Sequence, residues 1–424
     1  AGAWCGQNKY LSAIKNAFQN FMPLTIAGAI GVLWCNVLVN DQTGLGLFFK
    51  PIMALDFLNP AFQAVNFCTI SCITVGITLG IAQEIGVWNM GAEKAGYIPG
   101  LVGLAAWLSV TNTSHMVEGA KEAFTGIAGN ELGATGLFTG MIISVLSVEL
   151  FCFFEKQDAL KIKMPEQVPP GVARAFEVLV PATITLIITA CIGSACYNLT
   201  GLYLNDVIKN GIQGPLGAVG ATIPGVMIIY LVIMLFWLVG IHGNNMLSAV
   251  KEALFTPLAL ENVEKFNKGE KPTNIINMYA LQMWGEFGGS GVTIGLVIAI
   301  MIFGKREDNK AIATLSLVPG LFNINETVTF GVPMVLNPIL GIPFVVAPLI
   351  TIIIGYVLTV IGFCPVACLT VPWTTPPIVF GFLACGANVM GAVTQAILIV
   401  VSTVIYTPFL ISYEKYQNKQ AAEA

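Results

Sequence analysis

The chain has 424 residues, of which 56% are hydrophobic and only 10% are charged, and its mean hydropathy is +0.80. Soluble globular chains carry about 25% charged residues, so this composition indicates a polytopic protein embedded in a lipid bilayer. The net charge is −4 and the 19 basic residues are dispersed among predicted loops, which excludes a nucleic-acid partner.

Apolar runs along the chain predict several membrane-spanning helices, because a helix needs about 20 apolar residues to cross the hydrocarbon. Clear runs begin at Phe21, Ala61, Gly133, Val178, Gly217, Gly341 and Val389, with a weaker one at Tyr97. The segments Met283 to Phe303, interrupted by Glu286 and several glycines, and Ala313 to Phe322, too short to span, favour re-entrant hairpins. The predicted fold class is therefore all-α and polytopic.

Basic residues in short loops mark the cytoplasmic side of a membrane protein. Lys9 and Lys15 precede the first apolar run, and the alternation of the following loops places the N-terminus in the cytoplasm. Strict alternation would put the basic loop at residues 305–310 outside, unless the segment around Glu286 returns to the face it entered. One predicted loop is rich in basic residues and contains Lys251, Lys265, Lys268 and Lys271.

A polar, proline-containing stretch near residues 155–176 predicts a cytoplasmic amphipathic connector. It divides the chain into residues 1–176, a scaffold half, and residues 177–424, a working half, with the boundary open by one helix either way. The chain opens AGAWCGQ without Met, so we expect missing N-terminal residues and no cleavable signal peptide.

Nine cysteines lie in apolar segments and are interpreted as small hydrophobic residues. Cys364 and Cys368 have a spacing that could face a metal, but no His or second Cys pair stands nearby to complete a ligand set. We expect no metal and no cofactor.

Two ionisable residues in apolar surroundings are the main site candidates, since a charge at membrane depth costs about 3 kcal/mol or more. Glu326 lies in LFNINETVTFGVP, between Pro319-Gly320 and Gly331, which predicts a tight hairpin with a polar tip. A salt-bridged structural carboxylate is the alternative. His242 lies in GIHGNN, where its alternative is a helix end at the interface.

Further polar and aromatic residues extend these clusters. Asn244 and Asn245 place amide donors and acceptors beside His242. Trp373 and Thr374 lie in VPWTTPP, where an aromatic face beside a hydroxyl suits a sugar ring, although interface anchoring explains the tryptophan equally well. Stacking is also conceivable for Trp237 and Trp284.

The order GIHGNN, WGEFGGSG, LVPGLFNINETVTFGVPMVLNP and VPWTTPP resembles the enzyme IIC permeases of the bacterial sugar phosphotransferase system, of the lactose/cellobiose/diacetylchitobiose type. The resemblance covers nearly the whole chain. It implies a homodimer in the bacterial plasma membrane, with about ten transmembrane helices and two re-entrant hairpins per chain. It further implies an N-terminal scaffold and dimerisation half, and a C-terminal transport half that carries the sugar as an elevator.

The resemblance also implies a reaction, in which the membrane subunit of a phosphoenolpyruvate-dependent phosphotransferase presents the 6-hydroxyl of a β-linked disaccharide to a phosphocysteine of enzyme IIB. Glu326 would be the base and His242 would orient or share the proton. The substrate-binding candidates are Asn244, Asn245, Asn323, Asn325, Trp373, Thr374, Trp237, Trp284 and Glu286. The chain ends at ISYEKYQNKQAAEA, so we expect IIB on a separate chain.

Three other functions remain open at this point. A proton-coupled secondary transporter would use Glu326 as its proton site without phosphorylation. A channel would need a ring of polar groups along a pore, and a membrane-bound hydrolase a pair of acidic groups or a metal cluster. The residues do not distinguish cellobiose, diacetylchitobiose or lactose as the sugar.

Overall fold

The computed structural model describes residues 8–41, 45–47, 49–115, 124–165, 167–213, 215, 220–332 and 334–423. Gly217 and Pro333, used above as a span start and as part of a motif, lie outside these ranges. The chain forms two compact units: an N-terminal unit of Gly6–Gly28 and Ala64–Gly217, and a C-terminal unit containing Ala29–Gln63 and Ala218–Ala424. The main division between these compact units lies near residue 217, whereas the predicted halves divide at residue 176. A division into compact units does not show which unit moves during transport, so the assignment of a scaffold half and a transport half stays a prediction.

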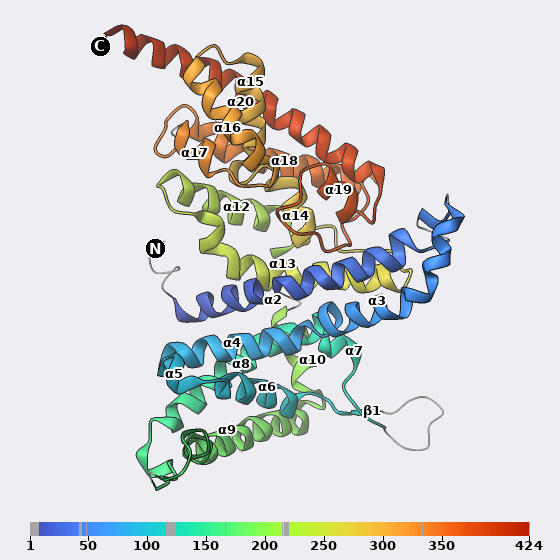
Figure 1. The fold of residues 1–424 in the computed structure, drawn as a ribbon, viewed down its shortest axis with the longest axis vertical. Helices are drawn as coiled ribbons and strands as arrows, with labels where there is room; N and C mark the ends of the chain where they lie inside the picture. Colours follow the sequence, from blue (N-terminus) through green and yellow to red (C-terminus); the bar gives the residue numbers. More distant parts are fainter. Residues whose placement is uncertain are drawn as a thin grey trace. The chain divides into compact units, whose positions relative to one another are not determined.

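The N-terminal unit is a helical bundle with one small hairpin (Figure 1). Helix α2 (Lys9–Leu33) and helix α3 (Asn59–Asn66) contribute to both units. The remaining elements are the π-helix η4 (Phe67–Ser71), α4 (Ile73–Met90), α5 (Ala92–Ala95), α6 (Ile98–Val110), strands β1 (Ser114–His115) and β2 (Phe124–Thr125), α7 (Gly129–Leu132), α8 (Ala134–Glu155), η5 (Asp158–Leu160), α9 (Pro170–Thr200), α10 (Leu204–Ile208) and η6 (Lys209–Gln213). Strands β1 and β2 pair antiparallel, with Ser114 opposite Thr125.

Helices α4, α6 and α8 pack side by side because small residues line their contacts (Figure 1). A Cβ atom on Gly103 would stand 2.3 Å from the Cβ of Ala82, so the backbones of α6 and α4 approach closely there. The Thr74 hydroxyl on α4 donates to the backbone oxygen of Gly133 at 2.7 Å, just before α8. Trp107 is fully buried in this core.

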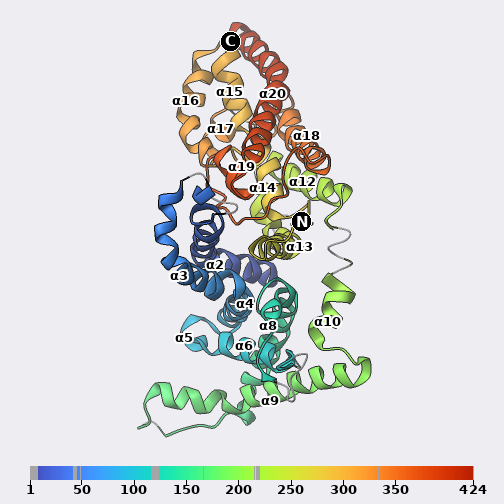
Figure 2. The ribbon, with the colours of Figure 1, turned by 90° about the vertical axis from the view of Figure 1, so that its right-hand side faces the viewer.

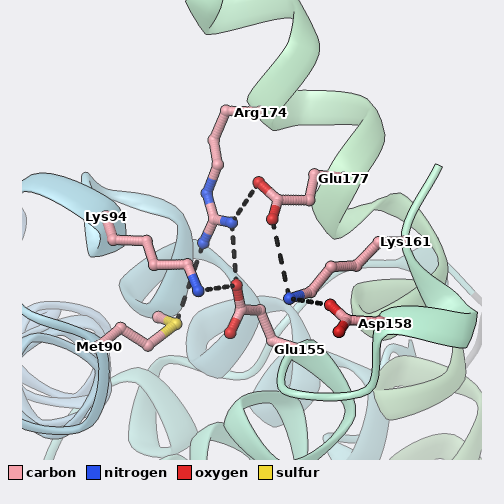
Figure 3. Close-up of polar contacts among 7 residues, drawn as sticks. All are labelled: Met90, Lys94, Glu155, Asp158, Lys161, Arg174 and Glu177. Carbon is pink, nitrogen blue, oxygen red and sulfur yellow. Dashed lines mark hydrogen bonds and ion pairs between the residues drawn. The ribbon is translucent and has the colours of Figure 1, made fainter. Parts of the chain in front are cut away.

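An ion cluster ties the end of α8 to α5 and to the start of α9 (Figure 3). The carboxylate of Glu155 is 1% exposed and accepts from Lys94 and from Arg174, both at 2.9 Å. Arg174 also donates to Glu177 at 2.7 Å, and Lys161 of the predicted connector pairs with Glu177 at 3.9 Å. The connector is thus anchored at both of its ends within this unit.

The C-terminal unit contains the longest helix of the described residues, α20 (Val389–Glu423), with α15 and α18 packed on it (Figure 2). Its other elements are η1 (Trp34–Leu38), η2 (Leu45–Leu47), η3 (Lys50–Leu58), α12 (Ile223–Leu238), α13 (Gly243–Asn267), α14 (Met278–Gly285), η7 (Ser290–Val292), α15 (Ile294–Phe303), α16 (Glu307–Leu321), α17 (Glu326–Gly331), α18 (Gly341–Val360) and α19 (Val379–Ala384).

The described residues hold five helices long and apolar enough to span a membrane: Lys9–Leu38, Thr135–Glu155, Pro170–Thr200, Gly341–Val360 and Val389–Gln420. Two further pairs are bent, by 41° between Lys50–Ser71 and Ile73–Met90, and by 60° between Met278–Val292 and Ile294–Phe303. Ile98–Val110 and Ile223–Leu238 are shorter apolar helices. The all-α membrane class is confirmed, whereas the number of ten spans is not.

The 60° bend lies in the glycine-interrupted segment that the sequence singled out. Such a bend fits a broken span as well as a re-entrant loop, so the re-entrant assignment stays a prediction. Two local expectations were wrong. Lys251 and Lys265 do not lie in a loop but inside α13, and α16 continues through Pro319-Gly320 to Leu321. Pro319 has no N–H to donate to the backbone oxygen four residues earlier, so the helix loses one hydrogen bond there, and it ends two residues later at Leu321.

Candidate functional site

A sharp turn after α14, residues 286–291 with the sequence EFGGSG, organises the candidate site and is called the glycine turn below. Gly288, Gly289 and Gly291 have φ of 70°, 87° and 80°, a backbone region that L side chains rarely adopt. A Cβ on Gly289 would stand 2.6 Å from the Cβ of Asn325. The glycines therefore permit both the turn and the close approach of residues 323–326, called the NINE segment below.

Three amides from two sequence motifs meet at this turn. The backbone N–H of Gly288 donates to the Asn323 side-chain oxygen at 2.6 Å, and Asn325 Nδ2 donates to the backbone oxygen of Ser290 at 2.8 Å. From GIHGNN, Asn244 Nδ2 donates to the Ser290 hydroxyl at 3.0 Å. The motifs GIHGNN (residues 240–245), WGEFGG (284–289) and NINET (323–327) are distant in the sequence and lie together in the fold.

His242 and Glu326 face each other beside these amides. His242 Nε2 lies 3.9 Å from Glu326 Oε1, and the two side chains are 38% and 48% exposed. The distance is too long for a direct hydrogen bond. An oxygen about 2.8 Å from each atom would bond to both, so one hydroxyl can be held between them.

The other nitrogen of His242 settles which groups can donate. His242 is the N-cap of α13, and its Nδ1 accepts from the backbone N–H of Asn245 at 3.2 Å. In the neutral ring the proton must then lie on Nε2, toward Glu326. The imidazole is therefore a hydrogen-bond donor at this point and the carboxylate is the acceptor, the arrangement needed for a carboxylate base.

Not all of the predicted sugar ligands have free amides. Asn323 Nδ2 donates to the backbone oxygens of Trp373 and of Thr375, the latter at 3.3 Å, and Asn325 also donates to the Thr329 hydroxyl at 3.1 Å. These two amides hold protein backbone, and contact with sugar stays a prediction for both. Among the predicted amides, the buried side-chain oxygen of Asn244 has no protein partner in the described residues, so it can accept from a hydroxyl.

The aromatic candidates lie in different environments. Trp373 is 44% exposed and is attached to the site through Asn323, with Thr374 half-buried beside it. Trp237 is 2% exposed and packs against the His242 ring, with centroids 4.4 Å apart. Trp284 is 1% exposed and packs against Gly355 of α18. Only Trp373 offers an open face, while Trp237 supports the histidine from behind.

Glu286 has partners that the sequence analysis missed. Its carboxylate accepts from the Tyr230 hydroxyl at 2.7 Å and pairs with the ammonium of Lys251. Lys251 is 6% exposed and Tyr230 is fully buried. Reading Lys251 as a loop charge concealed this pair. The signal that could have revealed it is a lysine between the apolar segments Met246–Val250 and Ala253–Phe255, since a charge buried at such a position requires an acidic partner.

Three buried cysteines that the sequence analysis interprets as small hydrophobic residues lie in the C-terminal unit. Cys364, Cys368 and Cys385 are buried, and the Sγ atoms of Cys364 and Cys385 lie 3.9 Å apart. In the part of the chain that the structure describes, no three His, Cys, Asp or Glu side chains are grouped as metal ligands. All nine described cysteines are free thiols.

Comparison with known proteins identifies relatives of the whole chain. The model of the family described as phosphotransferase system, EIIC, matches residues 15–348. The oligo-β-mannoside-specific EIIC component of Bacillus subtilis (strain 168) is 33% identical over 96% of this chain and 90% of that protein. The cellobiose-specific EIIC component of Lactococcus lactis subsp. lactis (strain IL1403) is 29% identical over 98% of this chain and 96% of that protein.

A solved structure shares the fold as well. The crystal structure of the transporter ChbC, the IIC component of the N,N'-diacetylchitobiose-specific phosphotransferase system, superposes with a TM-score of 0.90. The alignment has 29% sequence identity and covers 99% of this chain and 97% of that chain. The resemblance carried by the sequence motifs is confirmed.

Proposed function

Because this chain belongs to the EIIC family of the phosphotransferase system, and is thus a sugar permease subunit of the cellobiose and chitobiose type, we propose that it binds a β-linked disaccharide, moves it inward and presents its 6-hydroxyl for phosphorylation by enzyme IIB. The observation that carries the proposal is the pair of His242 Nε2 and Glu326 Oε1, 3.9 Å apart at a half-exposed position.

The transfer step follows from that pair. The 6-hydroxyl oxygen, held between the two side chains, attacks the phosphorus of the IIB phosphocysteine. The phosphorus–sulfur bond breaks, the thiolate leaves, and the hydroxyl proton passes to the Glu326 carboxylate. Nε2–H of His242 donates to the same oxygen and orients it. A positioned base of this kind contributes about 10²- to 10⁴-fold to the rate.

The remaining contacts serve alignment. The buried, unpartnered side-chain oxygen of Asn244 is an acceptor for a sugar hydroxyl that enters the site, and the exposed face of Trp373 can stack on a ring. Phosphoryl transfer depends mainly on placing the hydroxyl in line with the donor, so the conformational state that exposes the site to IIB gates the reaction.

The proposed function includes an oligomeric state and a membrane location for the chain. The chain functions as a homodimer in the bacterial plasma membrane, with its N-terminus in the cytoplasm, and its transport half carries the sugar as an elevator. IIB acts as a separate, phosphorylated partner chain. The same arrangement makes the protein the membrane subunit of a multi-chain sugar phosphotransferase and primarily a transporter.

The test is uptake of labelled disaccharides, cellobiose, N,N'-diacetylchitobiose and lactose, into cells that express this chain with and without its cognate IIB. Chemical analysis of the internal product decides the outcome. Sugar phosphate that forms only with IIB supports the proposal and names the substrate. Free sugar accumulated without IIB, and lost when the proton gradient collapses, would instead make the chain a proton-coupled symporter with Glu326 as the proton site.

A further inference from the structure

The buried ion pair between Lys251 and Glu286 has no role in the transfer step, yet it lies against the candidate site. Both side chains are shielded, 7% and 16% exposed, and Tyr230 covers them, with its ring 5.5 Å from the lysine ammonium and its hydroxyl bonded to Glu286. Such a pair is weak evidence for stability, because desolvation of two charges offsets much of their attraction. A pair of this kind is better explained by the geometry that it fixes.

The pair fixes the start of the glycine turn. Glu286 is the first residue of the turn, and its backbone oxygen accepts from Gly289 N at 3.0 Å. The far end is held separately, since the Tyr406 hydroxyl donates to the backbone oxygen of Gly291 at 2.8 Å. Between these two fixed points lies Ser290, to which Asn244 and Asn325 bond.

The pair also fixes helix α13, which carries His242 at its N-cap. Asn244 attaches the first turn of α13 to Ser290, and Lys251 attaches the same helix to Glu286, about 10 Å further along at 1.5 Å per residue. One attachment would let the helix pivot or rotate, whereas two define its orientation against the turn. The position of His242 depends on that orientation.

Glu326 is held near the same turn by the neighbouring residue, Asn325. Asn325 is 3% exposed and bonds to the backbone oxygen of Ser290. The two residues that face each other across 3.9 Å are therefore both placed from the glycine turn, His242 through α13 and Glu326 through Asn325.

We propose that Lys251 is a positioning residue, which with Glu286 and Tyr230 sets α13 against the glycine turn and thereby holds His242 opposite Glu326 for the sugar hydroxyl. This inference rests on the proposed function, because it takes the His242 and Glu326 pair as the sugar-hydroxyl site. It assigns Glu286 to an internal ion pair in place of a direct sugar ligand.

The test measures sugar affinity on purified, full-length protein without IIB, with N,N'-diacetylchitobiose and cellobiose as the two probes. Lys251→Met leaves the buried Glu286 carboxylate without its cation, and Glu286→Gln leaves the Lys251 ammonium without its ion-pair partner, so both are expected to melt at lower temperature. The double variant removes both charges together and is expected to recover the wild-type melting temperature. Its dissociation constant for the better probe is expected to stay raised by about tenfold, because a displaced His242 no longer bonds to the sugar hydroxyl.

Affinity in the double variant separates positioning from a merely structural role. A double variant that recovers both the melting temperature and wild-type affinity, within threefold, overturns the proposal. If the double variant does not fold, Tyr230→Phe provides the test, because it removes one donor to Glu286 and is expected to raise the dissociation constant by about two- to fivefold, with a smaller loss of melting temperature than either single charge variant. Unchanged affinity in Tyr230→Phe would then overturn the proposal.

The matched control is Lys268→Met, which removes an exposed ion pair with Glu264 at the end of the same helix and should change neither quantity. Sugar binding without IIB also separates this inference from the proposed function. Wild-type protein that binds sugar but forms no sugar phosphate with IIB contradicts the transfer step alone, while the affinities of the variants still decide the role of Lys251.

Discussion

The side-chain amide of Asn325 donates to the backbone oxygen of Ser290 at 2.8 Å, and this bond joins the NINE segment to the glycine turn 35 residues earlier. Its neighbour Glu326 thereby comes to face His242, which lies a further 44 residues before the turn begins at Glu286. The candidate site is thus assembled around one turn, and its parts can be tested separately.

Glu326→Gln is expected to retain sugar binding and to lose phosphorylation-coupled uptake by about 100-fold or more. The amide keeps the shape of the side chain and can still bond to a hydroxyl, but it cannot take the proton. Binding is measured on purified protein and sugar phosphate in cells that contain IIB. Full coupled uptake by this variant would remove Glu326 as the base.

His242 combines a cap with a donor, and two variants separate these roles. His242→Asn can still cap α13, so its unfolding free energy should remain within about 0.5 kcal/mol of wild type, whereas His242→Ala should lose about 1 kcal/mol. Both should impair sugar phosphorylation, because neither reaches the hydroxyl as Nε2 does. Thermal melting in detergent and a IIB-dependent transfer assay supply the two readouts. Normal transfer by His242→Asn would show that the ring is not needed.

Gly289→Ala should damage the site far more than the same change at Gly269. Both glycines have positive φ, 87° and 73°, so each variant pays a backbone cost of about 1 kcal/mol. The new Cβ at Gly289 would also stand 2.6 Å from Asn325, while Gly269 has nothing within 4 Å. Melting temperature and sugar affinity measured on both variants check this. Equal effects of the two changes would contradict the close approach of the NINE segment.

In the N-terminal unit, Glu155→Gln is expected to lower the unfolding free energy by about 3 kcal/mol. The change leaves the guanidinium of Arg174 with one fewer carboxylate and removes the partner that Lys94 reaches, in a cluster whose central carboxylate is 1% exposed (Figure 3). Glu307→Gln is the control, because its pair with Lys310 is exposed and should contribute less than about 0.5 kcal/mol. A Glu155→Gln protein that melts like the control would refute a structural role for the cluster.

The basic segment at residues 305–310, which includes the first turn of α16, should share a membrane face with the end of α20, because the Glu414 carboxylate accepts from the backbone N–H groups of Lys305 and Arg306 at 2.8 and 3.3 Å. If the bent segment at Glu286 is re-entrant, this face is the cytoplasm. A Lys310→Cys and a Lys415→Cys variant, each in a background without other reactive thiols, should react with an impermeant thiol reagent only in inside-out vesicles. Labelling of Lys310→Cys in intact cells would make the bent segment a broken span.

The sequence by itself determined the membrane class and the polar clusters that belong to a site. An ionisable side chain such as Glu326 is costly in hydrocarbon unless it faces protein or water, so its presence in an apolar stretch indicates a functional site. The motif order was enough to identify the family, and helix locations followed from apolar runs, although α2 and α9 begin before the runs at Phe21 and Val178.

Only the tertiary structure decided which residues are hydrogen-bond and ion-pair partners. Glu286 pairs with Lys251, and the amides of Asn323 and Asn325 bond to backbone oxygens, because the glycine turn brings α13, the end of α14 and the NINE segment within hydrogen-bond distance. Hydropathy and spacing describe one segment at a time and carry no information on such contacts. A hydrogen bond between distant residues depends on the path of the whole chain, and that path is set by packing.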